Sequence, residues 1–264
     1  MLSGASPAAS PGPGFAWRAG PIDAYTDEDG TLLRLMPDGG ALSVRHGRLR
    51  RAQGYAETAR ADRQFLARVG AIIRLRARGR FHVHAAGVAD PTGRGWLLAG
   101  ENGAGKSTLA YALTRAGWRL LGDDGVIIER TPSGSRHACA TMPLAVSRAL
   151  ATEFPELKGK EPPAGFIDDV RDRVPMRAAI AQRAPVAALV FLRRGDHDAI
   201  TPVSGADALA QLVRQSSWVL MPDGHAEAHL AALGELAERT PRFLLTHTAR
   251  QLHEVADTLT RALA

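Results

Sequence analysis

The stretch that most constrains this chain is a glycine-rich segment between two apolar runs. It consists of Gly100, Glu101, Asn102, Gly103, Ala104, Gly105, Lys106, Ser107 and Thr108. It matches the pattern G-x-x-x-x-G-K-S/T, in which the backbone N–H groups of a loop surround a polyphosphate. The apolar runs 96–99 and 109–113 supply the strand and the helix that such a loop connects. The sequence therefore predicts a nucleotide-binding α/β protein.

The residue types in this loop predict two cofactors. Glycines adopt backbone conformations that other residues avoid, so successive amides can turn toward one anion. We expect Lys106 to begin a helix and reach the terminal phosphates, and Ser107 to place its hydroxyl on Mg²⁺. A glycine-rich turn that binds nothing is the alternative interpretation, and the flanking strand and helix patterns argue against it. The predicted cofactors are ATP and Mg²⁺.

The composition indicates the size of the core and the cellular compartment that we expect. The chain has 264 residues with 45% hydrophobic content, enough for a substantial core. Its one cysteine, Cys139, excludes an internal disulfide and a cysteine-based zinc site, which favours a reducing compartment. Residues 1–14 read as a flexible leader without the pattern of a signal peptide, and no apolar run approaches the length of a membrane span. We expect a cytoplasmic protein without a membrane partner.

The net charge of +6 comes from 33 Lys and Arg against 27 Asp and Glu. A basic surface attracts polyanions. An arginine-rich composition is the simpler explanation, because the sequence has no aromatic-interleaved basic ribbon and no zinc knuckle. We therefore expect no specific nucleic-acid partner.

Hydrophobic periodicity and turn residues predict the organisation of the rest. The patterns predict a small strand-rich N-terminal appendage at residues 15–56 and a nucleotide-binding domain at residues 57–264. Within the second part we predict helices at 57–78, 144–154, 206–215, 226–239 and 248–263, strands at 81–88, 118–121, 126–128, 185–192 and 242–247, and a loop at 155–169 that ends in a mixed-charge run through Asp168 and Arg173.

Two adjacent carboxylates follow the loop helix. Asp123 and Asp124 come at the end of an apolar strand, and another strand begins just after them. Acidic residues at a strand end beside a phosphate loop are placed as a Mg²⁺ ligand and a general base. An Asp-Asp-Gly hairpin turn is the alternative, and both interpretations can hold together. His84 is predicted one strand away from the nucleotide, where a buried core histidine is the competing interpretation.

The spacing of His84, Lys106 and Asp123-Asp124 resembles that in the catalytic domain of HPr kinase/phosphorylase and of the HPr-kinase-like proteins of bacterial gene clusters. The resemblance covers roughly residues 80 to 130. It implies a core akin to phosphoenolpyruvate carboxykinase, with a mixed, strand-rich central sheet flanked by helices. It also implies an ATP-dependent protein-serine kinase in which Lys106 and Ser107 bind phosphates and Mg²⁺. Asp123 would then lie near the metal, Asp124 would be the base, and His84 would support the aspartate pair.

Departures from that family bear on the phosphate acceptor. The separate N-terminal domain is absent or reduced to the appendage, and no Glu-Arg-Gly-Leu-Gly type signature follows the aspartates. The acceptor is therefore left between an HPr-like carrier and a natural-product precursor peptide, such as a lasso-peptide precursor. Homo-oligomerisation is left open.

Two other functions compete with the kinase. Transporter-type ATPases share the loop, but they need a Ser-Gly-Gly signature and a later Asp-Glu pair, neither of which the chain contains. A nucleotide-binding regulatory module without catalysis is the third interpretation, and Asp124 argues against it. Arg193 and Arg194 are candidates for neutralising charge in the transition state, with solvated strand-end charges as the alternative. No role is predicted for Cys139, His137 or His247.

Overall fold

The computed structural model describes residues 16–19, 21–36, 39–131, 136–139, 144, 146–160, 180–248 and 259. They divide into two compact units, Met1–Gly79 with Ser217–His229 and Arg80–Ser216 with Leu230–Ala264. The predicted leader, the mixed-charge run and all but two residues of the predicted last helix lie outside the described residues. The appendage and kinase domain, with their boundary at 56/57, stay a prediction.

The first unit contains an antiparallel meander in which each strand pairs with the next. Its strands are β1 (Ala16–Ala19), β2 (Ile22–Asp27), β3 (Gly30–Leu35), β4 (Ala41–Arg45) and β5 (Arg48–Arg51). In β3, buried Thr31, Leu33 and Leu35 alternate with less buried neighbours, as expected for a sheet with one covered face. All five of these strands lie within residues 15–56, the range for which short strands were predicted.

Helix α1 (Arg60–Arg76) covers this sheet and confirms the helix predicted at 57–78. Its buried Leu66, Val69 and Ile73 recur at helical spacing and join the core of the strands. Gly70 allows the close approach, because a Cβ there would lie 2.4 Å from the Leu42 Cδ2 atom. The same unit includes the short helix η3 (Ser217–Leu220), which begins 141 residues after the end of α1.

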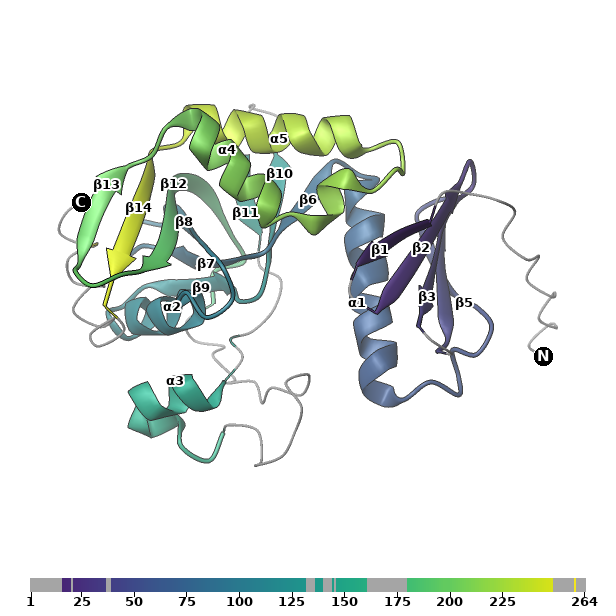
Figure 1. Ribbon diagram of the computed structural model, residues 1–264, viewed down its shortest axis with the longest axis horizontal. Coiled ribbons are helices and arrows are strands. Elements are labelled where there is room, and N and C mark those ends of the chain that lie inside the picture. The colour runs from purple at the N-terminus through teal and green to yellow at the C-terminus, as the bar shows by residue number, and fades with distance from the viewer. Residues whose placement is uncertain are drawn as a thin grey trace. The chain divides into compact units, whose positions relative to one another are not determined.

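The second unit contains a curled, mixed sheet (Figure 1). The main strand order is β6 (Arg80–Val83), β10 (Val126–Arg130), β11 (Arg136–Cys139), β12 (Arg183–Arg194), β8 (Gly95–Ala99), β7 (Ala85–Ala89) and β9 (Arg119–Gly122). Strand β14 (Arg242–His247) pairs with β12 and with β13 (Ala199–Pro202). Strand β12 runs parallel to β8 and β14, and the other pairs are antiparallel. The protein is therefore a mixed α/β protein.

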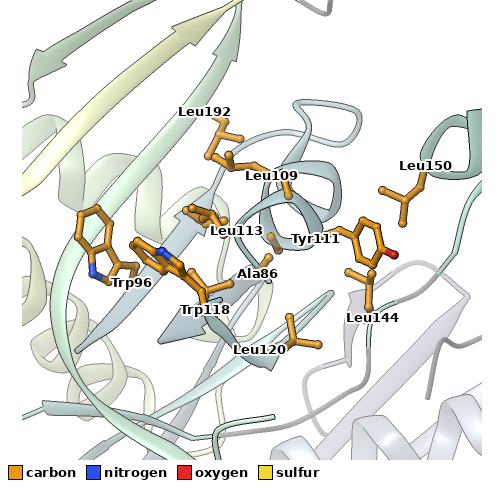
Figure 2. Packing of buried hydrophobic residues seen from close by; sticks show 14 of the residues in the cluster. Ala86, Trp96, Leu109, Tyr111, Leu113, Trp118, Leu120, Leu144, Leu150 and Leu192 are labelled. Carbon is orange, nitrogen blue, oxygen red and sulfur yellow. The ribbon is translucent and has the colours of Figure 1, made fainter. Parts of the chain in front are cut away.

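Helix α2 (Lys106–Arg115) covers β7, β8 and β9 on one face of this sheet. Figure 2 shows Leu113 of α2 close to Trp118 and Leu109 of the same helix nearer to Leu192. The rings of Trp96 and Trp118 meet edge to face with centroids 5.1 Å apart. The same cluster includes Leu150 of α3 (Arg148–Glu153) and Leu157 of the short helix η1 (Pro155–Leu157).

The alternate strand residues point to the opposite face of the sheet. Leu97, Leu189 and Phe191 are as buried as the residues of the α2 cluster but are not part of it. Figure 1 shows α4 (Gly205–Arg214) and α5 (Ala226–Arg239) on that side. Among the residues that the structure describes, no helix is both long enough and apolar enough to cross a bilayer.

The strand predicted at 81–88 is in fact two strands, β6 and β7, which meet at His84. The break has a physical cause, because β6 pairs with β10 whereas β7 pairs with β8 and β9. At the break, the backbone N–H of His84 donates to the carbonyl of Gln215 at 2.7 Å. The helix predicted at 144–154 is shorter, and β11 and β13 form where no strand was predicted.

Candidate nucleotide and phosphoryl-transfer site

Strand direction brings the predicted site segments to one edge of the second unit's sheet. Strands β8 and β9 both run antiparallel to β7, so their carboxyl ends lie beside the start of β7. The register pairs Ala85 with Ala99, which puts His84 next to the beginning of the glycine-rich loop. Asp123 and Asp124 follow β9 at the same edge. The carboxyl ends of β12 and β14 lie there too, because both run parallel to β8.

The loop between β8 and α2 has the backbone shape that its glycines allow. Gly100, Gly103 and Gly105 all have positive φ, at 153°, 80° and 94°. A Cβ at Gly100 would lie 2.7 Å from the carbonyl oxygen of Leu192, so the loop starts in close contact with β12. Gly105 precedes the first residue of α2 in a left-handed conformation. The strand, loop and helix predicted around residues 96–113 are all present.

Lys106, at the first position of α2, lies against this loop. Its ammonium group donates to the carbonyl oxygens of Gly100 at 2.7 Å and Glu101 at 3.1 Å. The residue is only 8% exposed. A buried ammonium beside a helix N-terminus adds its charge to that of the free amides, an arrangement suited to an anion.

Ser107 and Asp123 are joined directly. The Ser107 hydroxyl donates to Asp123 Oδ1 at 2.8 Å, and Asp123 is 2% exposed. The two residues come from different segments, the first turn of α2 and the end of β9. Their contact places a hydroxyl oxygen and a carboxylate oxygen side by side, and both are oxygen ligands of the kind that Mg²⁺ prefers.

Asp124 differs from Asp123 in both exposure and backbone. Its side chain is 45% exposed, and its φ is +65°, an uncommon conformation that aspartate tolerates better than most residues. The His84 Nδ1 atom lies 3.3 Å from the Asp124 carbonyl oxygen and 3.6 Å from its Oδ1 atom. A side chain at position 125 would have to displace the His82 ring, because a Cβ there would overlap His82 Nε2. Asp123 and Asp124 lie at a bend and not in a hairpin turn, because β9 pairs with β7 whereas β10 pairs with β6 and β11.

His247 is a contact of the loop to which the sequence assigned no role. It is the last residue of β14 and is fully buried, and its Nε2 atom lies 2.8 Å from the carbonyl oxygen of Ala104. A polar residue at the carboxyl end of a strand in an α/β sheet was the available signal, since ligands bind at that edge.

Arg193 and Arg194 end β12 at this edge and are both exposed. Arg193 Nη2 donates to Thr246 Oγ1 at 3.3 Å, which directs it along β14. Of the other residues given no role, His137 lies on β11, where it pairs in register with Glu129 and Pro185.

The residues present fit a nucleotide with Mg²⁺. Among the described residues, no three His, Cys, Asp or Glu side chains form a group that could hold a metal ion by themselves. Protein-bound Mg²⁺ commonly uses one or two carboxylates and completes its shell with substrate phosphates and water. The Ser107–Asp123 pair therefore suits a metal that arrives with a nucleotide better than a permanently bound one.

No family model matches the sequence, and no curated protein matches it. Among solved structures, the chain is similar to the HPr(Ser) kinase/phosphatase from Coxiella burnetii, with a TM-score of 0.38 and 14% sequence identity. The match covers 69% of this chain and 88% of that one. A likeness at this TM-score carries no argument about activity, so the function has to be inferred from the chain's own residues.

Proposed function

We propose that the chain is an ATP- and Mg²⁺-dependent serine kinase that transfers the γ-phosphoryl group to a protein or peptide hydroxyl. The observation that carries this proposal is the pairing of a buried with an exposed carboxylate at the phosphate loop. Asp123 accepts a hydrogen bond from Ser107 of the loop helix, while its neighbour Asp124 remains open to solvent beside His84. One carboxylate is suited to a metal and the other to a substrate.

The loop residues would bind and orient the nucleotide. Lys106 and the amides at the start of α2 would hold its phosphates, and Ser107 with Asp123 would hold Mg²⁺. When bound, ATP with Mg²⁺ supplies the transferable phosphoryl group and neutralises part of its charge. Glu101 to Ala104 shape the loop through its backbone, as in the bond from the Ala104 N–H to the Glu101 carbonyl at 3.1 Å.

Asp124 would act on the acceptor. Its carboxylate takes the proton of the serine hydroxyl as the serine oxygen bonds to the γ-phosphorus and the bond from that phosphorus to the leaving ADP oxygen breaks. His84, in contact with the backbone carbonyl of Asp124, would keep this carboxylate oriented. Arg193 is exposed at the same edge and is our candidate for meeting the charge of the transferring group.

The acceptor we propose is an HPr-like carrier or a natural-product precursor peptide such as a lasso-peptide precursor. The basic composition, with a net charge of +6, suits an acidic peptide. HPr and a set of serine-containing acidic peptides are therefore the acceptors to offer first.

The test is transfer from γ-labelled ATP in the presence of Mg²⁺. The wild type should label serine, and Asp124→Asn should slow the transfer by roughly 10²- to 10⁴-fold, the usual contribution of a general base. Asp29→Asn removes an exposed carboxylate of the first unit and should leave the rate unchanged. Wild-type transfer by Asp124→Asn would show that Asp124 is not the base. Release of inorganic phosphate alone, whatever acceptor is offered, would favour the ATPase alternative.

A further inference from the structure

His247 makes its contact with the loop from a distant and rigid position. It is separated from Ala104 by 143 residues, and its ring is fully buried. Its Nδ1 atom lies 3.2 Å from the carbonyl oxygen of Thr248, so both ring nitrogens face acceptors. A carbonyl oxygen can only accept a hydrogen bond, so the 2.8 Å contact makes Nε2–H the donor to Ala104.

The backbone around the ring is anchored on two sides. The carbonyl of His247 accepts from the Gly195 N–H at 3.0 Å, and the Thr248 N–H donates to Asp198 Oδ1 at 2.7 Å. Strand β14 also pairs along its length with β12 and β13. The ring therefore projects from backbone that has little freedom to shift.

The hydrogen bond from His247 to the Ala104 carbonyl also orients the next backbone amide of the loop. A trans peptide is planar, so the Ala104 carbonyl and the Gly105 N–H point in opposite directions. Binding the carbonyl to His247 consequently aims the Gly105 N–H away from β14. Gly105 has φ +94°, and glycine adopts either sign of φ with similar ease, so this plane needs an external anchor to keep its orientation.

We propose that His247 is a positioning residue for polyphosphate binding, which it serves by locking the Ala104–Gly105 peptide plane so that the Gly105 N–H faces the phosphates. This inference rests on the proposed nucleotide site. The ligand class is a nucleoside di- or triphosphate, because the amide that is held belongs to the loop rather than to a base or sugar pocket.

Two amide substitutions separate this role from packing. In His247→Gln the side-chain nitrogen can reach the position of Nε2, whereas in His247→Asn it reaches only that of Nδ1. The binding of ATP and ADP to the full chain is measured by calorimetry, together with the melting temperature of each variant. His247→Asn should bind both nucleotides about tenfold more weakly and His247→Gln within about threefold of wild type, because only the first leaves the Ala104 carbonyl unbonded. His197→Asn, at an exposed histidine, is the control and should bind as wild type.

The kinetic readout should follow the binding. In His247→Asn the KM for ATP should rise by a larger factor than kcat changes. In His247→Gln the KM should be close to that of the wild type. Nucleotide affinity that falls equally in the two variants, in step with their melting temperatures, would reduce His247 to a packing residue and overturn the proposal. Wild-type affinity in His247→Asn would also overturn it while leaving the kinase proposal intact. A wild-type chain that binds no ATP would overturn both.

Discussion

Two buried cations, one in each unit, are held in contrasting ways. Arg76 ends α1 and is 1% exposed, and its guanidinium donates to Asp223 at 2.8 Å and to the carbonyls of Val219 and Met221. Lys106 begins α2 and is 8% exposed, and its bonds to the Gly100 and Glu101 carbonyls stay within its own loop. Arg76 connects segments 147 residues apart, whereas those two bonds of Lys106 span five and six residues.

The difference distinguishes a cation that connects distant segments of its unit from one that we propose binds a ligand. Burial lowers the pKa of Arg76, and the nearby Asp223 carboxylate opposes that shift. Such a pair is costly to break, because either partner alone is left as a buried charge. Lys106 neutralises carbonyl dipoles of a glycine-rich loop, and a phosphate can compete for its ammonium protons. We therefore expect substitutions at the two positions to affect different measurements.

The largest effect should come from Arg76→Ala. The free energy of unfolding, measured in urea, should fall by about 3–5 kcal/mol because Asp223 loses its partner. Arg78→Ala, at an exposed position in the next turn, is the matched control. If Arg76→Ala does not fold, the double variant Arg76→Met with Asp223→Leu should, since an apolar pair removes both charges. Arg76→Ala with wild-type stability would contradict the comparison.

Lys106→Met should show the opposite pattern. ATP affinity, measured by calorimetry, should fall by about 10- to 100-fold because a charged hydrogen-bond donor to the phosphates is lost. Stability should change less than in Arg76→Ala, since the two carbonyl bonds are local. A variant that unfolds easily but binds ATP normally when folded would remove the distinction between the two cations.

Asp90 tests what determines the loss of stability when a buried charge is removed. The loss depends either on how far apart in sequence its partners lie or on its burial alone. It is 3% exposed, but its partners are local: Thr92, Arg94 and Trp96. Burial raises the pKa of Asp90, but the hydrogen bonds from Thr92 and Arg94 outweigh this effect and leave the pKa below its usual value. Asp90→Asn should cost about 2 kcal/mol of unfolding free energy at neutral pH.

The sign of the pH dependence follows from the lowered pKa. The carboxylate's contribution is complete above the unfolded pKa, about 3.9, and is lost as pH falls through the lower folded value. The stability difference between wild type and Asp90→Asn should therefore be constant from pH 7 to about 5 and shrink below pH 4. A difference that grows on acidification would mean that the pKa of Asp90 is raised.

The smallest effect should come from Arg45→Gln. Arg45 donates to Asp27 at 2.9 Å and to Asp29 at 3.2 Å, but the Arg45 side chain is 42% exposed and the two carboxylates are more exposed still, so water replaces much of the interaction. The urea midpoint should stay within experimental error of wild type. A clear loss of stability would show that exposed pairs of the first unit contribute like Arg76, which would weaken the contrast with Lys106.

Local patterns predicted the parts of the site that are contiguous in sequence. The loop, its flanking strand and helix, and the acidic pair each occupy a few successive residues, so motif and periodicity were sufficient to find them. The structure then brings Ser107 to Asp123, and His84 to Asp124. The roles of these residues in binding and catalysis stay predictions, because geometry alone does not test them.

Long-range pairing determines what the sequence missed. His247 reaches Ala104 because β14 lies parallel to β12, and no local pattern encodes that neighbour. Arg76 is buried because residues between 219 and 229 contact it, and no local pattern encodes those neighbours either. Strands β11 and β13 have little apolar alternation in their short sequences, RHAC and AITP, and their partners in the sheet are what make them strands.

The position of Asp223 and His247 in the chain has a consequence for synthesis. The meander and α1 of the first unit are synthesised early. Asp223, the partner of Arg76, is synthesised 147 residues later. The sheet of the second unit is likewise incomplete until β14 has been synthesised, and β14 brings His247 to the loop. Because chains emerge from the ribosome N-terminus first, the first unit lacks Asp223 until most of the second unit's sequence has been made, and the second unit lacks β14 until later still. Both cores therefore stay incomplete through most of synthesis.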